Sequence, residues 1–180
     1  MGRYCIAVFL LIVAQLLHAD YPGDSVYLLK SEWLTQDSKK VYLADLAGEK
    51  LVISMTYTSC QHTCPTIVSN MQAIERSLSQ NERRNVRFVL VSLIPKSDTT
   101  EALKAYSLKR DLKDWTLLSG SDEDVRMLAM VLNVKYKVLS ENEISHSNLI
   151  TILDDQGRIE RQITDIHSNI HLFAEHLHHE

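Results

Sequence analysis

The chain lacks the features that mark a nucleic-acid-binding or multidomain protein. It has no block of basic residues and no stretch in which basic and aromatic residues are interleaved, and its formal net charge is −4. This composition excludes nucleic acid from the expected partners. There is also no internal repeat, no low-complexity segment and no linker that would separate two domains, so we expect one domain.

The N-terminal residues are typical of a targeting segment. Arg3 supplies a positive charge, residues 4–17 form an apolar run, and Ala19 ends a short cleavage-site pattern. The run is shorter than the roughly 20 residues that a membrane-spanning helix needs. We therefore expect a signal peptide at 1–19 and a single exported domain at 20–180, in the periplasm or at the outer face of the inner membrane. An uncleaved N-terminal membrane anchor is the alternative.

Cysteine and proline are both scarce, with three of each. Cys5 falls inside the targeting segment, so the exported domain has one pair, Cys60 and Cys64, in a compartment that is expected to be oxidising. The pair follows the apolar run 51–57, and Pro65 then suits the first turn of a helix. A strand that ends in a thiol-bearing loop and enters a helix is a common setting for redox sites and for metal sites.

Strand and helix patterns alternate along the domain in the order hairpin, β-α-β-α-β-α and then β-β-α. This order predicts an α/β thioredoxin-like fold, in which helices flank a central mixed sheet and a β-hairpin comes first. Methionines on the helical patterns are interpreted as core residues, namely Met71, Met127 and Met130. The expected strands are 26–33 and 40–43 in the hairpin, then 51–57, 86–93, 115–118, 148–153 and 158–163. The expected helices begin near Thr66, Ala102 and Ser121, and a last helix spans 166–178.

The chemistry of Cys60 and Cys64 is open at this point. A helix N-terminus lowers the pKa of a nearby thiol, so at least one of the two should be partly thiolate at neutral pH. Three residues separate the cysteines, whereas a thioredoxin-type redox motif has two, and the wider loop lets both sulfurs face one ion. A structural disulfide is the weaker alternative because closing so small a loop adds little stability.

A proline is missing where thioredoxin-like oxidoreductases place one in the cis form. That position precedes the strand after the third helix, and here residues 144–148 read Ile-Ser-His-Ser-Asn. His146 is therefore expected to lie across from the two cysteines. Two sulfurs and one imidazole nitrogen suit copper, as Cu(I) or Cu(II), whereas zinc would need a fourth ligand. The sequence thus predicts one copper ion per chain, held by Cys60, Cys64 and His146.

On these residues the chain resembles the Sco (SenC-type) copper proteins of cytochrome c oxidase assembly. The resemblance covers about 26–173 and rests on the Cys-Gln-His-Thr-Cys-Pro loop at 60–65, on Asp98-Thr99, on Gly120 and on His146-Ser147. It implies that the two cysteines and the histidine bind copper. It also implies a metallochaperone rather than an enzyme, with the dinuclear copper centre of cytochrome c oxidase subunit II as the acceptor.

Departures from the family pattern lie around these ligands. The family usually has an Asp-Pro-x-Arg-Asp-Thr-Pro run, whereas residues 94–100 read Ile-Pro-Lys-Ser-Asp-Thr-Thr, and Met55-Thr56 replaces an aromatic–glycine pair. The segment between Tyr136 and His146 is also short. These departures concern the surface that meets a partner, so a different copper acceptor stays open.

Two functions follow from the cysteine pair. Copper delivery requires reduced thiols, and hence a thioredoxin-like reductase as a second partner. The alternative is a periplasmic thiol–disulfide oxidoreductase, in which Cys60 and Cys64 cycle between dithiol and disulfide and act on cysteines of a copper acceptor. The missing proline argues against a general oxidoreductase, because that residue shapes the substrate groove.

Further polar side chains have two interpretations each. His62, inside the cysteine loop, is an auxiliary ligand or, more simply, a solvent-facing residue. Asp98 orients His146 through a hydrogen bond or caps the following helix, for which Thr99 is the other candidate cap. The C-terminal histidines fit a solvated, frayed helix end better than a second metal site; they are His167, His171, His176, His178 and His179.

Overall fold

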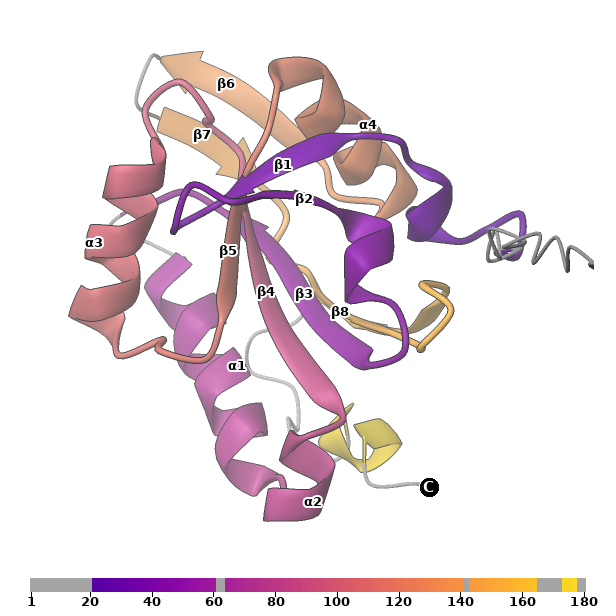
Figure 1. Cartoon of the computed structure of the whole chain (residues 1–180). Coiled ribbons are helices and arrows are strands. Elements are labelled where there is room, and N and C mark those ends of the chain that lie inside the picture. The colour runs from indigo at the N-terminus through magenta and orange to yellow at the C-terminus, as the bar shows by residue number, and fades with distance from the viewer. Residues whose placement is uncertain (1–20, 61–63, 141–142, 165–172, 178–180) are drawn as a thin grey trace, which may run out of the picture.

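The structure is a computed structural model that describes residues 21–60, 64–140, 143–164 and 173–177 (Figure 1). Its main sheet consists of β1 (Glu32–Thr35), β2 (Lys40–Tyr42), β3 (Lys50–Thr56), β4 (Val86–Ser92), β5 (Thr116–Ser119), β8 (Ile150–Leu153) and β9 (Ile159–Ile163). The seven strands have the order β2-β1-β5-β4-β3-β8-β9. Strands β3, β4 and β5 run parallel, and antiparallel strands extend the sheet on both sides. The predicted fold class, with its N-terminal hairpin, is confirmed.

The central strands β3 and β4 are buried on both faces. All residues of β3 from Leu51 to Thr56 are buried, and in β4 only Arg87 is partly exposed. Such continuous apolar runs are expected where helices cover both faces of a parallel sheet. The register runs from Lys50 opposite Val86 to Thr56 opposite Ser92, so the carboxyl ends of both strands meet at one edge of the sheet. The cysteine loop leaves β3 from this edge.

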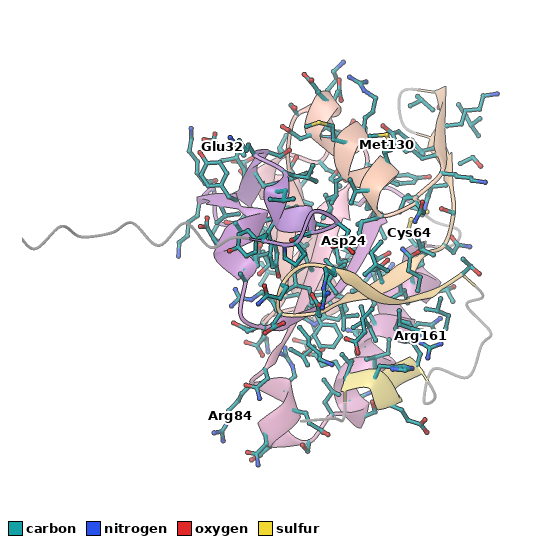
Figure 2. The ribbon with its side chains drawn as sticks, turned by 90° about the vertical axis from the view of Figure 1, so that its right-hand side faces the viewer. Asp24, Glu32, Cys64, Arg84, Met130 and Arg161 are labelled. Carbon is teal, nitrogen blue, oxygen red and sulfur yellow. The ribbon has the colours of Figure 1, made fainter. Side chains whose placement is uncertain are left out.

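Different elements cover the two faces of the sheet. On one face lie the helices α1 (Cys64–Ser77) and α3 (Thr100–Arg110), and α2 (Gln80–Arg83) follows α1. On the other face lie α4 (Asp122–Val131) and the short 3-10 helices η1 (Val26–Leu28) and η2 (Leu43–Leu46). Apolar residues of α1 form one buried stripe: Ile67, Met71 and Ile74. The interpretation of Met130 as a core residue was wrong, because its side chain on the outer surface of α4 is 73% exposed (Figure 2).

A two-stranded sheet that the sequence did not predict lies beside α4. Strands β6 (Tyr136–Ser140) and β7 (Glu143–His146) form an antiparallel hairpin that is separate from the main sheet (Figure 1). After Tyr136 every residue of β6 is exposed. The segment therefore has no alternation of buried and exposed positions, and alternation is the pattern by which a half-buried strand is recognised.

The beginning and the end of the predicted element order also differ from the structure. Residues 26–28 form η1 rather than a strand, because the Ser25 hydroxyl accepts a hydrogen bond from the Tyr27 N–H and closes a turn. This turn packs on Gly157, where an added Cβ would lie 2.7 Å from the Tyr27 ring. The predicted targeting segment 1–19 and most of the predicted helix 166–178 lie outside the described residues. The described part of that helix contains η3 (Glu175–Leu177). Among the described residues, no helix combines the length and apolarity needed to cross a membrane.

Candidate metal centre

The cysteine loop is held at the carboxyl end of β3. Cys60 follows a turn in which its N–H donates to the Tyr57 carbonyl at 3.3 Å. Cys64 is the first residue of α1 and is fully buried, whereas the Cys60 side chain is 8% exposed. The two cysteines are not joined in a disulfide bond. Because β3 is buried from Leu51 to Thr56 and α1 packs on the same core, the core of the fold sets the position of both sulfurs.

Asp98 braces the start of this loop. Its carboxylate accepts hydrogen bonds from the Thr58 hydroxyl at 2.5 Å, from the Thr58 N–H at 3.1 Å and from the Ser92 hydroxyl at 2.7 Å. The side chain is 1% exposed. Both interpretations made from the sequence were therefore wrong. Asp98 bonds to Thr58 rather than orienting His146, and Thr99 is the residue that caps α3.

His146 reaches the cysteines from the other side, as the last residue of β7. The Ser147 N–H donates to the Lys135 carbonyl at 2.8 Å, and the Ser147 hydroxyl accepts from the Lys135 N–H at 3.0 Å. The Tyr57 hydroxyl donates to the Ile144 carbonyl at 3.3 Å, so a residue next to the cysteine loop holds β7. These contacts fix the backbone on both sides of the histidine.

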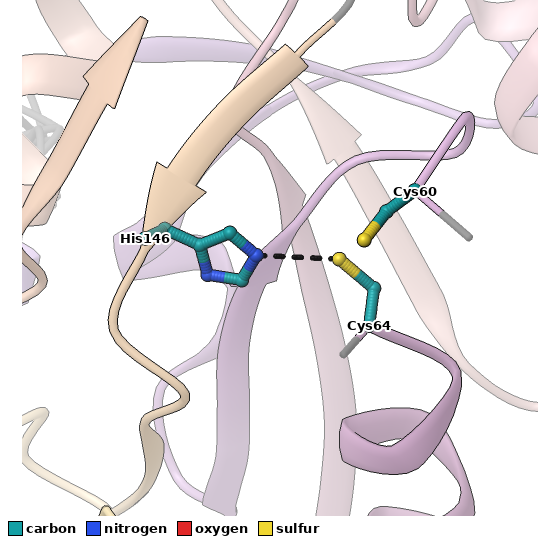
Figure 3. Close-up of side chains that lie close together, drawn as sticks. All are labelled: Cys60, Cys64 and His146. Carbon is teal, nitrogen blue, oxygen red and sulfur yellow. Dashed lines mark hydrogen bonds between the residues drawn. The ribbon is translucent and has the colours of Figure 1, made fainter. Parts of the chain in front are cut away.

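The structure brings the three predicted ligands together (Figure 3). The Cys60 Sγ, the Cys64 Sγ and a ring nitrogen of His146 all lie within 4.8 Å of one another. The Cys64 Sγ and the His146 Nε2 are 3.3 Å apart. Two sulfurs from the cysteine loop and one nitrogen from the end of β7 thus converge on one point. A bound metal ion requires such an arrangement of ligand atoms.

A hydrogen bond fixes the tautomer of His146, and therefore which of its two ring nitrogens has a free lone pair. The Nδ1 atom lies 3.1 Å from the Ser147 carbonyl oxygen. A carbonyl can only accept, so Nδ1 carries the proton and Nε2 has the free lone pair. Metal-bound histidines commonly donate their second N–H in this way, which fixes the ring and its tautomer. The Nε2 atom is therefore ready to accept from the Cys64 thiol or to bind a metal ion.

Burial shapes the electrostatics of the centre. It lowers the pKa of His146 below its usual value, more than the hydrogen bond to Ser147 raises it, so the imidazole is neutral at pH 7. Burial, followed by the hydrogen bond with the Cys60 thiol, raises the pKa of Cys64 well above its usual value. Cys64 is therefore a protonated thiol at neutral pH, and the prediction that at least one of the two cysteines is partly thiolate now concerns Cys60. An ion that binds here has to displace the Cys64 proton.

Tyr57 is a residue of the site that the sequence did not single out. Its ring lies edge-on to the His146 imidazole, with ring centres 5.9 Å apart. Burial, followed by a hydrogen bond with the Cys60 thiol, raises the pKa of Tyr57. Tyr57 therefore contacts Cys60, His146 and the backbone of β7 at once. A tyrosine three residues before the first cysteine carries no signal of this role, because the contacts depend on where β7 lies.

Several other predicted candidates are outside the described residues or away from the centre. His62, His167, His171, His178 and His179 are not described. His176 is described, and its ring contacts the Arg161 guanidinium while its carbonyl accepts from Lys50 Nζ at 2.9 Å. Since Lys50 begins β3 and the cysteine loop follows its end, His176 is separated from the metal centre by the length of that strand.

Comparisons with known proteins agree with this architecture. A family model described as SCO1/SenC matches residues 28–179. A SCO2-like protein of Rickettsia prowazekii is 29% identical over 132 residues, which are 69% of this chain and 63% of that protein. The chain thus spans less than two thirds of the length of this relative.

Two solved structures illustrate the similarity in fold. ScoI of Bradyrhizobium japonicum with copper bound has a TM-score of 0.71 and 23% identity, covering 82% of this chain and 95% of that one. A SCO1/SenC family lipoprotein of Bacillus anthracis has a TM-score of 0.74 and 24% identity, covering 85% of this chain and 94% of that one. The family model extends over most of the chain, from η1 to the last described helix. The chain belongs to the SCO1/SenC family.

Proposed function

We propose that the chain binds one copper ion through Cys60, Cys64 and His146 and passes it to an acceptor protein. The observation that carries this proposal is the convergence of two sulfurs and one imidazole nitrogen within 4.8 Å. By its family, the acceptor is the dinuclear copper centre of cytochrome c oxidase subunit II. An exported location is part of the same proposal. A thioredoxin-like reductase is a further partner in it, because copper binding requires reduced thiols.

The chemistry of the donor set supports copper. Thiolates are soft ligands that favour Cu(I), and imidazole binds both oxidation states of copper. Structural zinc sites are closed by four protein ligands, and the described residues converge on this point with three. The ScoI structure of Bradyrhizobium japonicum is a copper-bound member of the same fold, which supports the choice of metal.

A second candidate function is thiol–disulfide exchange by the same cysteines. One observation favours it: Cys60 is 8% exposed while Cys64 is fully buried behind it. An accessible cysteine beside a buried one can form a mixed disulfide that the second thiol then resolves. The two functions differ in their need for His146, which copper binding uses and disulfide exchange does not.

Anaerobic titration of the reduced chain with Cu(I) against a competing chelator tests the proposal. The wild type should bind one Cu(I). Cys60→Ser, Cys64→Ser and His146→Ala should each weaken binding by about a hundredfold, since a structural metal site gains roughly 3 kcal/mol from each of its ligands. His176→Ala is the matched control, because it removes an imidazole at the far end of β3.

The same variants separate the two functions. Wild-type affinity in His146→Ala, together with reduction of a disulfide-bonded test peptide, would reject the copper site and leave thiol–disulfide exchange. If His146→Ala loses copper binding but keeps disulfide exchange, then copper binding needs the histidine and disulfide exchange does not. The chain would then be capable of both reactions.

A further inference from the structure

A groove of about 730 Å³ lies between α3 and the described residues at the two ends of the cysteine loop. Its volume is in the usual range of ligand-binding clefts, roughly 300–1,000 Å³. Of the three residues of the metal centre, only Cys60 is among the described residues that line it. Lining residues come from the loop (Thr58, Ser59, Cys60 and Pro65) and from α3 (Ala102, Ala105, Tyr106, Lys109 and Arg110).

The charge of the groove is opposite to that of the chain. Among its described lining residues the charged ones are Lys109 and Arg110, both positive, whereas the chain has a net charge of −4. Neither of the two forms an ion pair with an acidic residue in the described part of the chain. The groove therefore presents two positive charges that no described carboxylate neutralises.

Two buried polar atoms at the groove have no hydrogen-bond partner among the described residues: the Tyr106 hydroxyl and the Arg110 Nε. Tyr106 is 9% exposed, and the Arg110 guanidinium carbon lies 5.6 Å from the centre of its ring. Buried donors are normally hydrogen-bonded, and leaving them unpaired costs stability. The Arg110 Nε can only donate and the Tyr106 hydroxyl can donate, so an acceptor that reached them would give both a partner.

We propose that this groove docks an acidic segment, one bearing Asp or Glu, of the protein that exchanges copper with the metal centre. A carboxylate accepts hydrogen bonds from a guanidinium and a phenol, and a charge-assisted pair with arginine is stronger than a neutral one. The inference rests on the proposed copper transfer for the identity of the partner.

The position of Cys60 supports a protein segment as the occupant. Copper passes by ligand exchange, so the ligands of the partner have to come within bonding distance of a sulfur. Cys64 is fully buried and Cys60 is 8% exposed, so the partner approaches over Cys60. A segment that runs along the groove from Cys60 to Arg110 would hold the partner in that place.

Two fluorescent synthetic peptides without cysteine test the groove directly. They have the same length and sequence, except that one carries glutamates where the other carries glutamines. Titrated into the reduced, copper-free full chain, the glutamate peptide should bind about tenfold more tightly by fluorescence anisotropy. Its advantage should shrink as salt is added, because Lys109 is exposed and its charge is screened. Backbone amide shifts should change in α3 between residues 102 and 110.

Variants on and off the groove sharpen the test. Lys109→Gln with Arg110→Gln should bring the affinity for the glutamate peptide down to that for the glutamine peptide. Lys104→Gln with Lys113→Gln removes the same charge from side chains that pair with Asp37 and Asp111, and it should keep the selectivity. Circular dichroism and thermal unfolding verify that both variants fold.

Tyr106→Phe removes only the unpartnered hydroxyl of a buried ring. It should weaken binding of the glutamate peptide about threefold, the loss of one hydrogen bond. Its unfolding temperature should not fall, because this hydroxyl bonds to no described residue in the chain itself. A purely structural role for Tyr106 would give the opposite pair of results.

Equal binding of the two peptides, or equal loss of selectivity in both double variants, overturns the groove proposal. Displacement of the glutamate peptide by free glutamate at the same concentration per carboxylate also overturns it, in favour of a small-anion site. Peptide binding uses the copper-free chain, so its failure is distinct from failure of the proposed function. The latter is seen when the reduced wild type takes up no Cu(I).

Discussion

The cysteine side and the histidine side of the candidate metal centre are built in different ways. Cys60 and Cys64 follow β3, which is hydrogen-bonded to β4 on one side and to β8 on the other in the middle of the seven-stranded sheet. His146 ends β7, which pairs with β6 in a separate two-stranded sheet. The core of the fold therefore positions two of the three donor atoms, and a peripheral hairpin positions the third.

Tyr57 makes several of the contacts that connect the two sides among the described residues. Its hydroxyl donates to the Ile144 carbonyl, and its ring lies against the His146 imidazole. Lys135 and Ser147 hold the hairpin by two hydrogen bonds at its base. The distance from the sulfurs to the His146 Nε2 therefore depends on polar contacts at the edge of the fold, whereas the distance between the sulfurs depends on the core.

The largest effect on stability is expected when one isoleucine on each side is replaced by alanine. Ile53 in β3 is fully buried and Ile144 in β7 is 6% exposed. Ile53→Ala should lower the free energy of unfolding by about 4 kcal/mol and Ile144→Ala by about 2 kcal/mol, because the central strand is enclosed on both faces. Urea unfolding of the copper-free chain measures both values.

Copper binding by the folded variants sharpens the comparison. Ile144→Ala should weaken Cu(I) binding more than Ile53→Ala does, although it destabilises the chain less, because Ile144 lies two residues from the histidine ligand. Equal weakening would show that the hairpin and the central strand position the centre equally firmly.

The next largest effect is expected at Asp98. Asp98→Ala leaves the Thr58 and Ser92 hydroxyls and the Thr58 N–H without their acceptor in a buried place, and should cost about 3 kcal/mol of stability. It should also weaken Cu(I) binding, because the start of the cysteine loop is released. Thr99→Ala is the control: it removes the cap of α3 at a cost of about 1 kcal/mol and should leave Cu(I) binding unchanged.

The pH dependence of copper binding should differ between the two sides. The raised pKa of Cys64 means that its proton has to leave when the ion binds, so affinity gains about tenfold per pH unit for this proton. The lowered pKa of His146 means that the imidazole is already neutral and releases no proton above pH 7. Affinity therefore rises with pH, and the rise comes from the cysteine side.

Competition titrations between about pH 7 and 8 test this assignment. Cys64→Ser should reduce the slope of the logarithm of affinity against pH by about one. His146→Ala should weaken binding at every pH without changing the slope. A lower slope in His146→Ala would mean that the histidine is protonated in the copper-free chain.

The smallest effect is expected at Tyr57. Tyr57→Phe keeps the ring against His146 and removes the hydroxyl that bonds to the Ile144 carbonyl and to the Cys60 thiol. Stability should fall by about 1 kcal/mol, and Cu(I) affinity should fall severalfold as the hairpin loosens. Tyr42→Phe, at an exposed ring on β2, is the matched control and should change neither value. An unchanged affinity in Tyr57→Phe would leave Lys135 and Ser147 as the contacts that hold the histidine.

Much of the fold could be predicted because its signals are local. The apolar runs of β3 and β4, the stripe of α1 and the Ser121–Asp124 capping box of α4 all lie within a few neighbouring residues. The hairpin β6–β7 could not be predicted in this way. Its side chains are mostly exposed, so its strands are specified by cross-strand pairing and by packing of Ile144 on the core.

The residues of the candidate site also differ in whether local sequence signals reveal them. Cys60 and Cys64 are recognisable because their spacing and their place between a strand and a helix are written in consecutive residues. The partners of Asp98 and the contacts of Tyr57 are not, since Asp98 follows Thr58 by 40 residues and Ile144 follows Tyr57 by 87. Sequence spacing of this kind contains no information about which polar groups meet.

The sequence by itself determined the thioredoxin-like order of elements and the cysteine pair at the end of a central strand, because apolar periodicity and residue type are local properties. Only the tertiary structure decided the protonation of the centre and the contacts that hold it. Burial raises the pKa of Cys64 more than backbone hydrogen bonds lower it, and the Ser147 carbonyl selects the tautomer that presents Nε2. Both outcomes depend on what surrounds a side chain, and in a folded protein the surroundings come from distant parts of the chain.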